Sequence, residues 1–204
     1  ITFDPSLKGG TIDLGSGELV INKDVTVLGL GADQLAVSGS RKSRILMLNS
    51  NSPPYNILID GLTVKNGFQR EGRGGAILND HASLIVRNCT VMDSWAFEGG
   101  GIYNVGALNI NNSTLSGNYA FDGGGAIFNR AELTLSQCTI AGNFGRGGAI
   151  NIEAGVVKIN QSTLSGNHDE SEAGGIRNAG GDLKLLNSIV ADNSPINIKG
   201  NFTQ

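Results

Sequence analysis

The sequence predicts an all-β chain that folds as a right-handed, single-stranded parallel β-helix, a solenoid of about eight coils with three short strands in each. Two observations carry this prediction. A block rich in glycine and asparagine recurs at a nearly constant spacing, and the segments between its copies alternate apolar and polar residues. A repeat of roughly 20–50 residues indicates a solenoid, and strict alternation indicates half-buried strands.

The recurring block reads Gly-Gly-(Ala)-Ile-x-Asn, and its five copies stand at 74–79, 100–104, 124–129, 147–151 and 174–178. Their isoleucines are 25, 25, 23 and 26 residues apart. One turn of this length accommodates three strands that are separated by Gly and Asn corners, because both residues tolerate a left-handed backbone. The block therefore predicts one rung of a β-helix in each copy.

The segment after each block is equally regular. Its copies alternate apolar and polar residues and stand at 57–64, 84–91, 108–115, 133–140, 157–164 and 183–190. No stretch keeps a 3.6-residue apolar period, and glycine pairs interrupt every repeat. A helical solenoid is therefore disfavoured.

The ends of the chain are less regular than its middle. We expect N-terminal coils and a cap over 1–56, regular repeats over 57–194, and a tail or incomplete coil over 195–204, all in one domain. Candidate strands of the first part are 11–14, 18–22, 25–28, 34–38 and 44–48, with a turn between coils at 50–54.

Composition excludes several classes of protein. The 204 residues carry a net charge of −3 and only 16% charged residues, so nucleic acid is not an expected partner. No apolar run reaches the roughly 20 residues that a transmembrane helix needs. The two cysteines, Cys89 and Cys138, hold the same position two coils apart, about 9–10 Å between Cα atoms. A disulfide needs less than about 7 Å, so we expect two free, buried thiols.

The pattern resembles a bacterial family of right-handed parallel β-helix surface proteins that is related to the polymorphic outer-membrane-protein repeat, with a pectin-lyase-like fold. The motifs that carry the resemblance are Gly-Gly-Gly-Ile-Tyr-Asn at 99–104, Asn-Ser-Thr-Leu at 112–115 and Ser-Gly-Asn at 116–118. The segments 1–5 and 29–35 are similar to that family's N-terminal module. The resemblance implies an extracellular or cell-surface protein, and we expect the chain to be a processed fragment of a longer one.

Two columns of asparagine run across the repeats. The first contains Asn79, Asn104, Asn129 and Asn178, and is broken in the fourth rung, where Ile152 takes the position. The second contains Asn118, Asn143, Asn167 and Asn193. We interpret both as structural ladders in which stacked amides hydrogen-bond between coils.

A third column is aromatic. Its members lie at one corner of five successive coils, and two further rings flank it: the column is Phe68, Trp95, Tyr119, Phe144 and His168, and the flanking rings are Phe97 and Phe121. Stacked rings could staple the loops to the body of the solenoid. An exposed strip of rings could instead bind a sugar or a protein partner. The sequence leaves both interpretations open.

A fourth column is charged and stands just before the glycines: Arg73, Glu98, Asp122, Arg146 and Glu172. Opposite charges in neighbouring coils predict a ladder of ion pairs. The same column supplies the first candidates for catalysis, Glu98 and Asp122, because a glycosidase needs two nearby carboxylates. The acidic run at 168–172 is more typical of a solvated loop than of a metal site.

These observations favour a non-catalytic structural or interaction module. We expect a protein or glycan partner along the strip formed by Phe68, Trp95, Tyr119 and Phe144 with its charged margin at Arg73 and Arg146, and end-to-end or lateral contacts between proteins. We expect no cofactor, no metal and no nucleic acid. The alternative is a polysaccharide lyase, a glycoside hydrolase or a carbohydrate-binding module that uses the same face.

Overall fold

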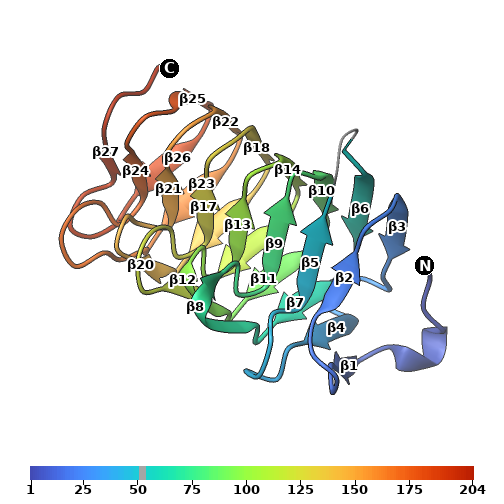
Figure 1. The fold of residues 1–204 in the computed structure, drawn as a ribbon. Coiled ribbons are helices and arrows are strands. Elements are labelled where there is room, and N and C mark those ends of the chain that lie inside the picture. The colour runs from blue at the N-terminus through green and yellow to red at the C-terminus, as the bar shows by residue number, and fades with distance from the viewer. Residues whose placement is uncertain (51–53) are drawn as a thin grey trace.

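The computed structural model describes residues 1–50 and 54–204, so most of the turn predicted at 50–54 lies outside the described residues. The chain is an all-β parallel solenoid, which confirms the predicted fold class, and it has about seven turns where the sequence predicted about eight coils. Its strands stack in order from the N-terminus to the C-terminus, and the two ends of the chain lie at opposite ends of the stack (Figure 1).

Two parallel sheets form the back and one side of the described part of the solenoid. Sheet A contains, in spatial order, β25 (Asp182–Leu186), β22 (Val156–Asn160), β18 (Leu133–Ser136), β14 (Ala107–Asn111), β10 (Ser83–Arg87), β6 (Asn56–Asp60) and β3 (Val25–Leu28). Sheet B contains β1 (Gly10–Asp13), β4 (Leu35–Ser38), β7 (Thr63–Lys65), β11 (Thr90–Met92), β15 (Thr114–Ser116), β19 (Thr139–Ala141), β23 (Thr163–Ser165) and β26 (Ile189–Ala191).

Sheet C carries the strands of the glycine block. It contains β2 (Leu19–Ile21), β5 (Leu46–Asn49), β9 (Ile77–Asp80), β13 (Ile102–Asn104), β17 (Ile127–Asn129), β21 (Ile150–Ile152), β24 (Ile176–Asn178) and β27 (Ile198–Lys199). A fourth, short sheet was not expected. Sheet D contains β20 (Phe144–Gly145), β16 (Tyr119–Ala120), β12 (Trp95–Glu98) and β8 (Phe68–Arg73). Coils in the middle of the chain therefore have four strands in place of three, because the aromatic corner also pairs from coil to coil.

Helix is nearly absent from residues 1–50 and 54–204, which contain one short 3-10 helix, η1 (Pro5–Leu7). No helix in this part of the chain is long and apolar enough to cross a membrane. The tail 195–204 continues the stack: β27 pairs with β24, and Thr203 forms a bridge with Lys184 of β25.

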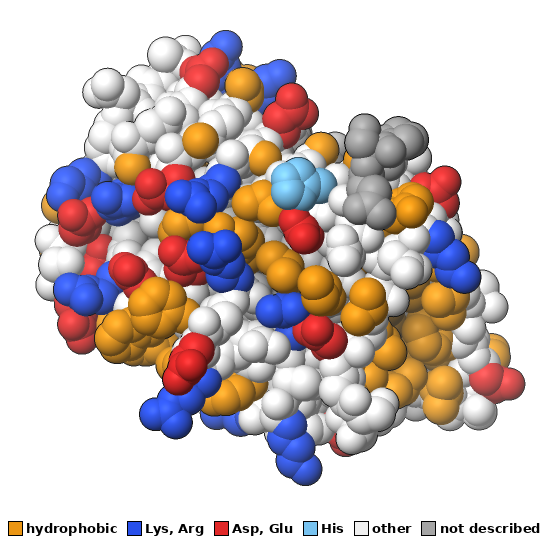
Figure 2. All heavy atoms as spheres, in the orientation of Figure 1, with side chains coloured by type: hydrophobic (Ala, Val, Ile, Leu, Met, Phe, Trp, Pro, Cys, Tyr) orange, Lys and Arg blue, Asp and Glu red, His pale blue; other side chains and the backbone are white. Residues whose placement is uncertain are grey.

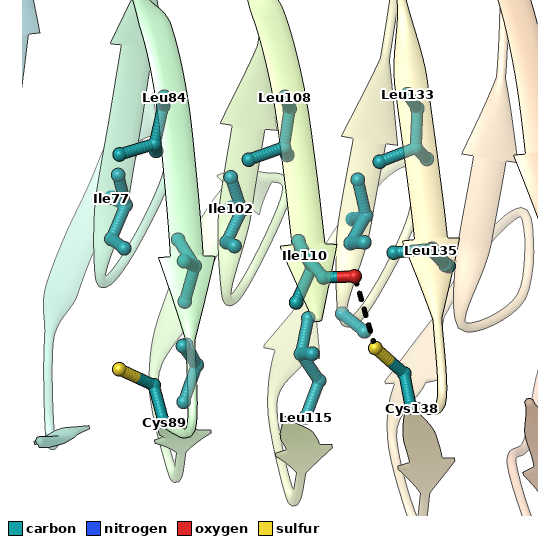
Figure 3. Packing of buried hydrophobic residues seen from close by; sticks show 14 of the residues in the cluster. Ile77, Leu84, Cys89, Ile102, Leu108, Ile110, Leu115, Leu133, Leu135 and Cys138 are labelled. Atoms are coloured by element: carbon teal, nitrogen blue, oxygen red, sulfur yellow. Dashed lines mark hydrogen bonds between the residues drawn. The ribbon is translucent and has the colours of Figure 1, made fainter. Parts of the chain in front are cut away.

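The interior is one continuous column of aliphatic side chains. Ile77, Ile102 and Ile127 are in register and fully buried, and Leu84, Leu108 and Leu133 face them from sheet A. Figure 3 shows Leu84, Leu108 and Leu133 at one level in successive coils, and Ile77 and Ile102 at a similar level opposite them. Each rung alone could not bury its apolar face, so stacking of the rungs supplies the hydrophobic stabilisation.

Asparagine or glutamine stands at the corner between sheets A and B in four successive coils, where the backbone is left-handed. Asn88, Asn112, Gln137 and Gln161 all have positive φ, between 45° and 57°. This conformation turns the chain sharply between two flat strands. The glycine pairs have another role. A Cβ on Gly100 would lie 2.2 Å from the Tyr119 carbonyl oxygen, so only glycine permits the close approach of the next coil.

The first asparagine column forms a ladder over three coils. Asn79 donates through Nδ2 to Asn104 Oδ1, and Asn104 donates to Asn129 Oδ1, each at 2.8 Å. All three side chains are fully buried. Ile152 then occupies the next register position, and Asn178 follows it. Asn178 donates to the backbone carbonyl oxygens of Gly181 and Asn201, so among the described contacts it has no bond to the side-chain amide of another asparagine in the column.

The second asparagine column is longer. Nδ2 of each residue donates to Oδ1 of the next through Asn118, Asn143, Asn167, Asn193 and Asn197, at distances of 3.0, 2.9, 2.8 and 3.0 Å. Each of those oxygens also accepts the backbone N–H of the preceding asparagine. The amides thus satisfy buried polar groups that would otherwise lose their hydrogen bonds to water.

Replacement of one amide in the middle of this ladder tests its energetic importance. Asn143→Ala removes a side chain that accepts from Asn118 and donates to the Leu115 and Ala141 carbonyl oxygens. Because buried partners are left unsatisfied, we expect a loss of about 3 kcal/mol or more in the free energy of unfolding by urea. Asn109→Ala, at a half-buried site on the outer face of sheet A, should cost less than about 1 kcal/mol. Equal losses in the two variants would contradict the structural role of the ladder.

Candidate functional site

The predicted aromatic column is a stack of rings on sheet D. Phe68, Trp95, Tyr119 and Phe144 are in direct register, and His168 joins through an isolated bridge. Successive ring centroids lie 5.0, 5.9, 5.0 and 5.4 Å apart. The first three pairs are nearly parallel, with interplanar angles of 18°, 8° and 3°, and the fourth is tilted by 40°. The first four side chains of the column are half-buried, and His168 is exposed.

Stacking of the rings along the solenoid leaves little ring face available for binding. The face of each inner ring lies against the face of its neighbour, so the outer surface of the column consists mainly of ring edges. A sugar ring stacks on an aromatic face, and the faces of Trp95 and Tyr119 are already covered. The column therefore serves the fold through stacking contacts, each about 0.5–1.5 kcal/mol beyond the burial of area.

The two flanking rings behave differently from the column. Phe97 and Phe121 are 39% and 49% exposed, and their centroids lie 5.4 Å apart at an interplanar angle of 31°. They form an apolar pair on the surface, which we call the phenylalanine pair. Each is followed directly by an acidic residue of the charged column, Glu98 or Asp122. Apolar and charged side chains therefore adjoin here.

A second aromatic stack lies on the outer face of sheet C, and the sequence reasoning missed it. Tyr103 and Phe128 are in register, with centroids 5.1 Å apart and an interplanar angle of 8°, and both are buried. The guanidinium of Arg73 lies 4.9 Å above the Tyr103 ring, and that of Arg130 lies 5.9 Å from the Phe128 ring. The sequence did contain a signal for this stack. The position directly after the isoleucine of each block is aromatic in two successive copies, and across the copies it is Leu78, Tyr103, Phe128, Asn151 and Arg177.

Two cavities lie along this face, and we call them together the lateral groove. One has a volume of about 470 Å³ and is lined by Arg44, Glu71, Gly72, Arg73, Leu78, Phe97 and Glu98. The other has a volume of about 440 Å³ and is lined by Glu98, Asp122, Gly123, Phe128, Arg130, Arg146, Asn151, Glu153, Ser171, Glu172 and Arg177. Glu98 lines both cavities. Tyr103 stands between them, because its neighbours Leu78 and Phe128 line one each. Figure 2 shows basic and acidic side chains interspersed on this face, over the C-terminal half of sheet C, with hydrophobic side chains beside them.

Most charges of the groove are paired. Arg73 Nε donates to Glu98 Oε2 at 2.9 Å, in agreement with the predicted charge ladder. The ladder does not continue as expected. Glu172 bonds to Arg177 and, at 3.1 Å, to Lys199, and Arg177 also bonds to Glu153 at 2.8 Å. These partners come from the outer face of sheet C and its flanks, since their long side chains reach the groove from the side.

Three charged groups that line the cavity of about 440 Å³ have no ion-pair or hydrogen-bond partner for their side chains within residues 1–50 and 54–204: Asp122, Arg130 and Arg146. In the cavity of about 470 Å³, Glu71 is likewise unpaired among the described residues. The predicted charge ladder places Arg146 between Asp122 and Glu172, and the described ion pairs join Arg146 to neither. All three side chains are exposed at the rim of the cavity of about 440 Å³. The groove therefore retains charge that an external group can use.

A buried polar atom also lacks a partner at this site. Among the described residues, the hydroxyl of Tyr103 has no hydrogen-bond partner, although the residue is only 1% exposed. A buried hydroxyl without a partner is rare, and such groups commonly bond to water or to a ligand. Tyr103 lines neither cavity, so this hydroxyl lies beneath the surface of the groove and is not one of its lining groups.

The candidate carboxylates Glu98 and Asp122 do line one cavity. Glu98, however, is held by Arg73. The nearby Glu172 has a pKa below its usual value, because Lys199 and Arg177 hydrogen-bond to its carboxylate. A glycosidase acid needs a raised pKa, so Glu172 is unsuited to that role. Groups of three or more His, Cys, Asp or Glu side chains that could hold a metal are absent from the described part of the chain.

The cysteines contribute to the core and not to the groove. Cys89 and Cys138 are free and buried, as predicted. The thiol of Cys138 donates to the Ile110 carbonyl oxygen at 3.3 Å (Figure 3). Burial raises the pKa of the Cys89 thiol to about 11. A thiol with such a pKa is a poor nucleophile near neutral pH.

A comparison of two aromatic truncations separates the stacked column from the phenylalanine pair. Tyr119→Ala removes a half-buried ring with a neighbour on both faces, so we expect the free energy of unfolding to fall by about 2–3 kcal/mol. Phe121→Ala removes a ring that is 49% exposed, and should cost less than about 1 kcal/mol. Urea unfolding followed by circular dichroism measures both. A larger loss for Phe121→Ala would show that our division of the rings into structural and surface groups is wrong.

Comparisons with known proteins add no family to this description. Searches against protein-family models, curated proteins and solved structures found no match. The parallel β-solenoid of about seven turns follows from the strand pairing itself. The lateral groove, the phenylalanine pair and the three unpaired charges are the features from which a function can be argued.

Proposed function

We propose that the chain is a non-catalytic interaction module that binds a protein partner along the lateral groove. The observation that carries the proposal is the combination of unpaired charges at one cavity of the groove with the exposed phenylalanine pair, of which Phe97 lines the other cavity. Interfaces between proteins place aromatic residues and arginine at their centre and polar residues around them. The groove has both, and its two cavities extend along the stacking direction over several coils.

A protein is favoured over a glycan as the partner for a physical reason. Glycan recognition by aromatic residues uses exposed ring faces, and the inner rings of the column present edges. The phenylalanine pair gives a tilted, uneven apolar surface that suits an apolar side chain better than a flat sugar ring. The likeness of the repeat to that of bacterial surface proteins supports an extracellular setting for this interaction.

A second candidate is a polysaccharide-active enzyme, which one observation favours: Glu98 and Asp122 line the same cavity. In that case Glu98→Gln and Asp122→Asn would each abolish turnover of a susceptible polysaccharide, as measured by release of reducing ends. An interaction module shows no turnover of any polysaccharide in such a panel with the unaltered chain. The ion pair of Glu98 with Arg73 makes us prefer the interaction module.

The phenylalanine pair provides the test. Short peptides selected from a random display library against the unaltered chain should bind much less tightly to the double variant Phe97→Ala, Phe121→Ala. Loss of two partly exposed rings at a contact predicts at least tenfold weaker binding by fluorescence anisotropy.

The control is a double variant that removes equally exposed apolar side chains from sheet A. Ile85→Ala, Val156→Ala removes residues that are 40% and 41% exposed on a different face. This variant should bind the selected peptides with unchanged affinity. The proposal fails if the two double variants bind alike, or if the unaltered chain selects glycans from an array and no peptides.

A further inference from the structure

The arginines of the lateral groove fall into two groups. Arg44, Arg73 and Arg177 each bond to a carboxylate: Arg44 to Glu18 at 2.7 Å, Arg73 to Glu98, and Arg177 to Glu153 and Glu172. Arg130 and Arg146 have no carboxylate partner within residues 1–50 and 54–204, and both line the cavity of about 440 Å³. The charges in the first group are neutralised by the chain itself. Those in the second group are not.

The two unpaired arginines are presented from different strands of the same face. Arg130 directly follows β17, and its guanidinium lies 5.9 Å from the ring of Phe128. This contact restricts the side chain without using its N–H donors. Arg146 directly follows β20 of sheet D. Each guanidinium has five N–H donors in a planar arrangement that matches the two oxygens of a carboxylate.

The balance of unpaired charge at the cavity is positive. Asp122 is the one unpaired acid among the described lining residues, against two unpaired bases. Both guanidinium groups are exposed, so bringing an anion to them requires little desolvation of buried charge.

We infer that the partner presents an acidic segment to the lateral groove, with an Asp or Glu carboxylate bound by Arg130 and Arg146 and a neighbouring apolar side chain on the phenylalanine pair. This inference rests on the proposed function, since it requires a protein partner. The ion pairs of the groove make the site selective. Glu18, Glu98, Glu153 and Glu172 already pair with Arg44, Arg73 and Arg177, so Arg130 and Arg146 are the arginines without a carboxylate partner among the described lining residues. Charge-assisted bonds of this type are stronger than neutral ones.

The test uses two fluorescent peptides of equal length, one of alternating Glu and Phe and one of alternating Gln and Phe. The unaltered chain should bind the Glu-Phe peptide at least tenfold more tightly than the Gln-Phe peptide. Arg130→Gln and Arg146→Gln should each weaken the Glu-Phe peptide about tenfold and leave the Gln-Phe peptide unchanged, which corresponds to the loss of one charge-assisted contact. Addition of salt should weaken binding of the Glu-Phe peptide to the unaltered chain more than to either variant.

Lys158→Gln is the matched control, because it removes an exposed positive charge from sheet A on another face. It should bind both peptides as the unaltered chain does. If Lys158→Gln weakens the Glu-Phe peptide as much as Arg146→Gln does, the attraction is one of overall charge and the inference is wrong.

The remaining outcomes separate this inference from the proposed function. Equal binding of both peptides, lost only in Phe97→Ala, Phe121→Ala, would overturn the acidic segment and leave the groove as a peptide site. Failure of both designed peptides, while library-selected peptides still bind the groove, would also overturn it. Failure of every peptide would contradict the proposed function itself. Alginate is an acidic polysaccharide. If alginate bound in a manner that depends on Arg130 and Arg146 while the Glu-Phe peptide did not bind, the ligand of this site would be a glycan and the inference would be wrong.

Discussion

Hydrogen bonds between buried asparagine side chains of successive coils hold the register on which every other feature of this molecule depends. In the longer ladder the amide oxygens of Asn143, Asn167 and Asn193 each accept two N–H groups from the asparagine of the preceding coil, one from its backbone and one from its side chain. A slip of one residue would break these bonds and would also turn the apolar side chains of a strand outward. The ladder and the aliphatic interior therefore specify the same alignment of coils.

That alignment creates columns of equivalent residues, and the columns explain both stability and the candidate site. On sheet D it brings rings face to face, which strengthens the fold and hides the ring faces. On the outer face of sheet C the same alignment stacks Tyr103 on Phe128. The next two positions of that column are polar, Asn151 and Arg177. The groove develops where the aromatic stack ends and long charged side chains begin, because those side chains extend around a hollow.

Much of the fold was predictable from the sequence because structural positions repeat. The isoleucines of the block, the asparagine columns and the positive-φ corners recur in nearly every rung, and each has a direct backbone reason. Sheet D was not predicted, since two-residue strands such as β16 and β20 leave no alternation to detect. Asn197 was also missed as the last amide of its ladder, because the tail does not repeat the motif.

The candidate site was less predictable for a physical reason. The positions of Phe97, Phe121, Glu98 and Asp122 were found by counting along the repeat, and so was the aromatic column. The partners of charged side chains cannot be predicted by counting along the repeat. The charged column predicted ion pairs between neighbouring coils, but Glu172 bonds to Arg177 and Lys199, which lie outside the column, because long side chains reach partners in adjacent columns. Arg130 lies outside the repeated block, so its place beside Phe128 emerged only from the three-dimensional structure.

The most direct test of the central claim, that the lateral groove is the interaction surface, is the mapping of backbone amide shifts by nuclear magnetic resonance during titration with a library-selected peptide. The account predicts that the largest changes fall in the segments around Phe97, Phe121 and Arg146, with little change along the outer faces of sheets A and B. Largest changes on sheet A or B, with the groove unaffected, would contradict it.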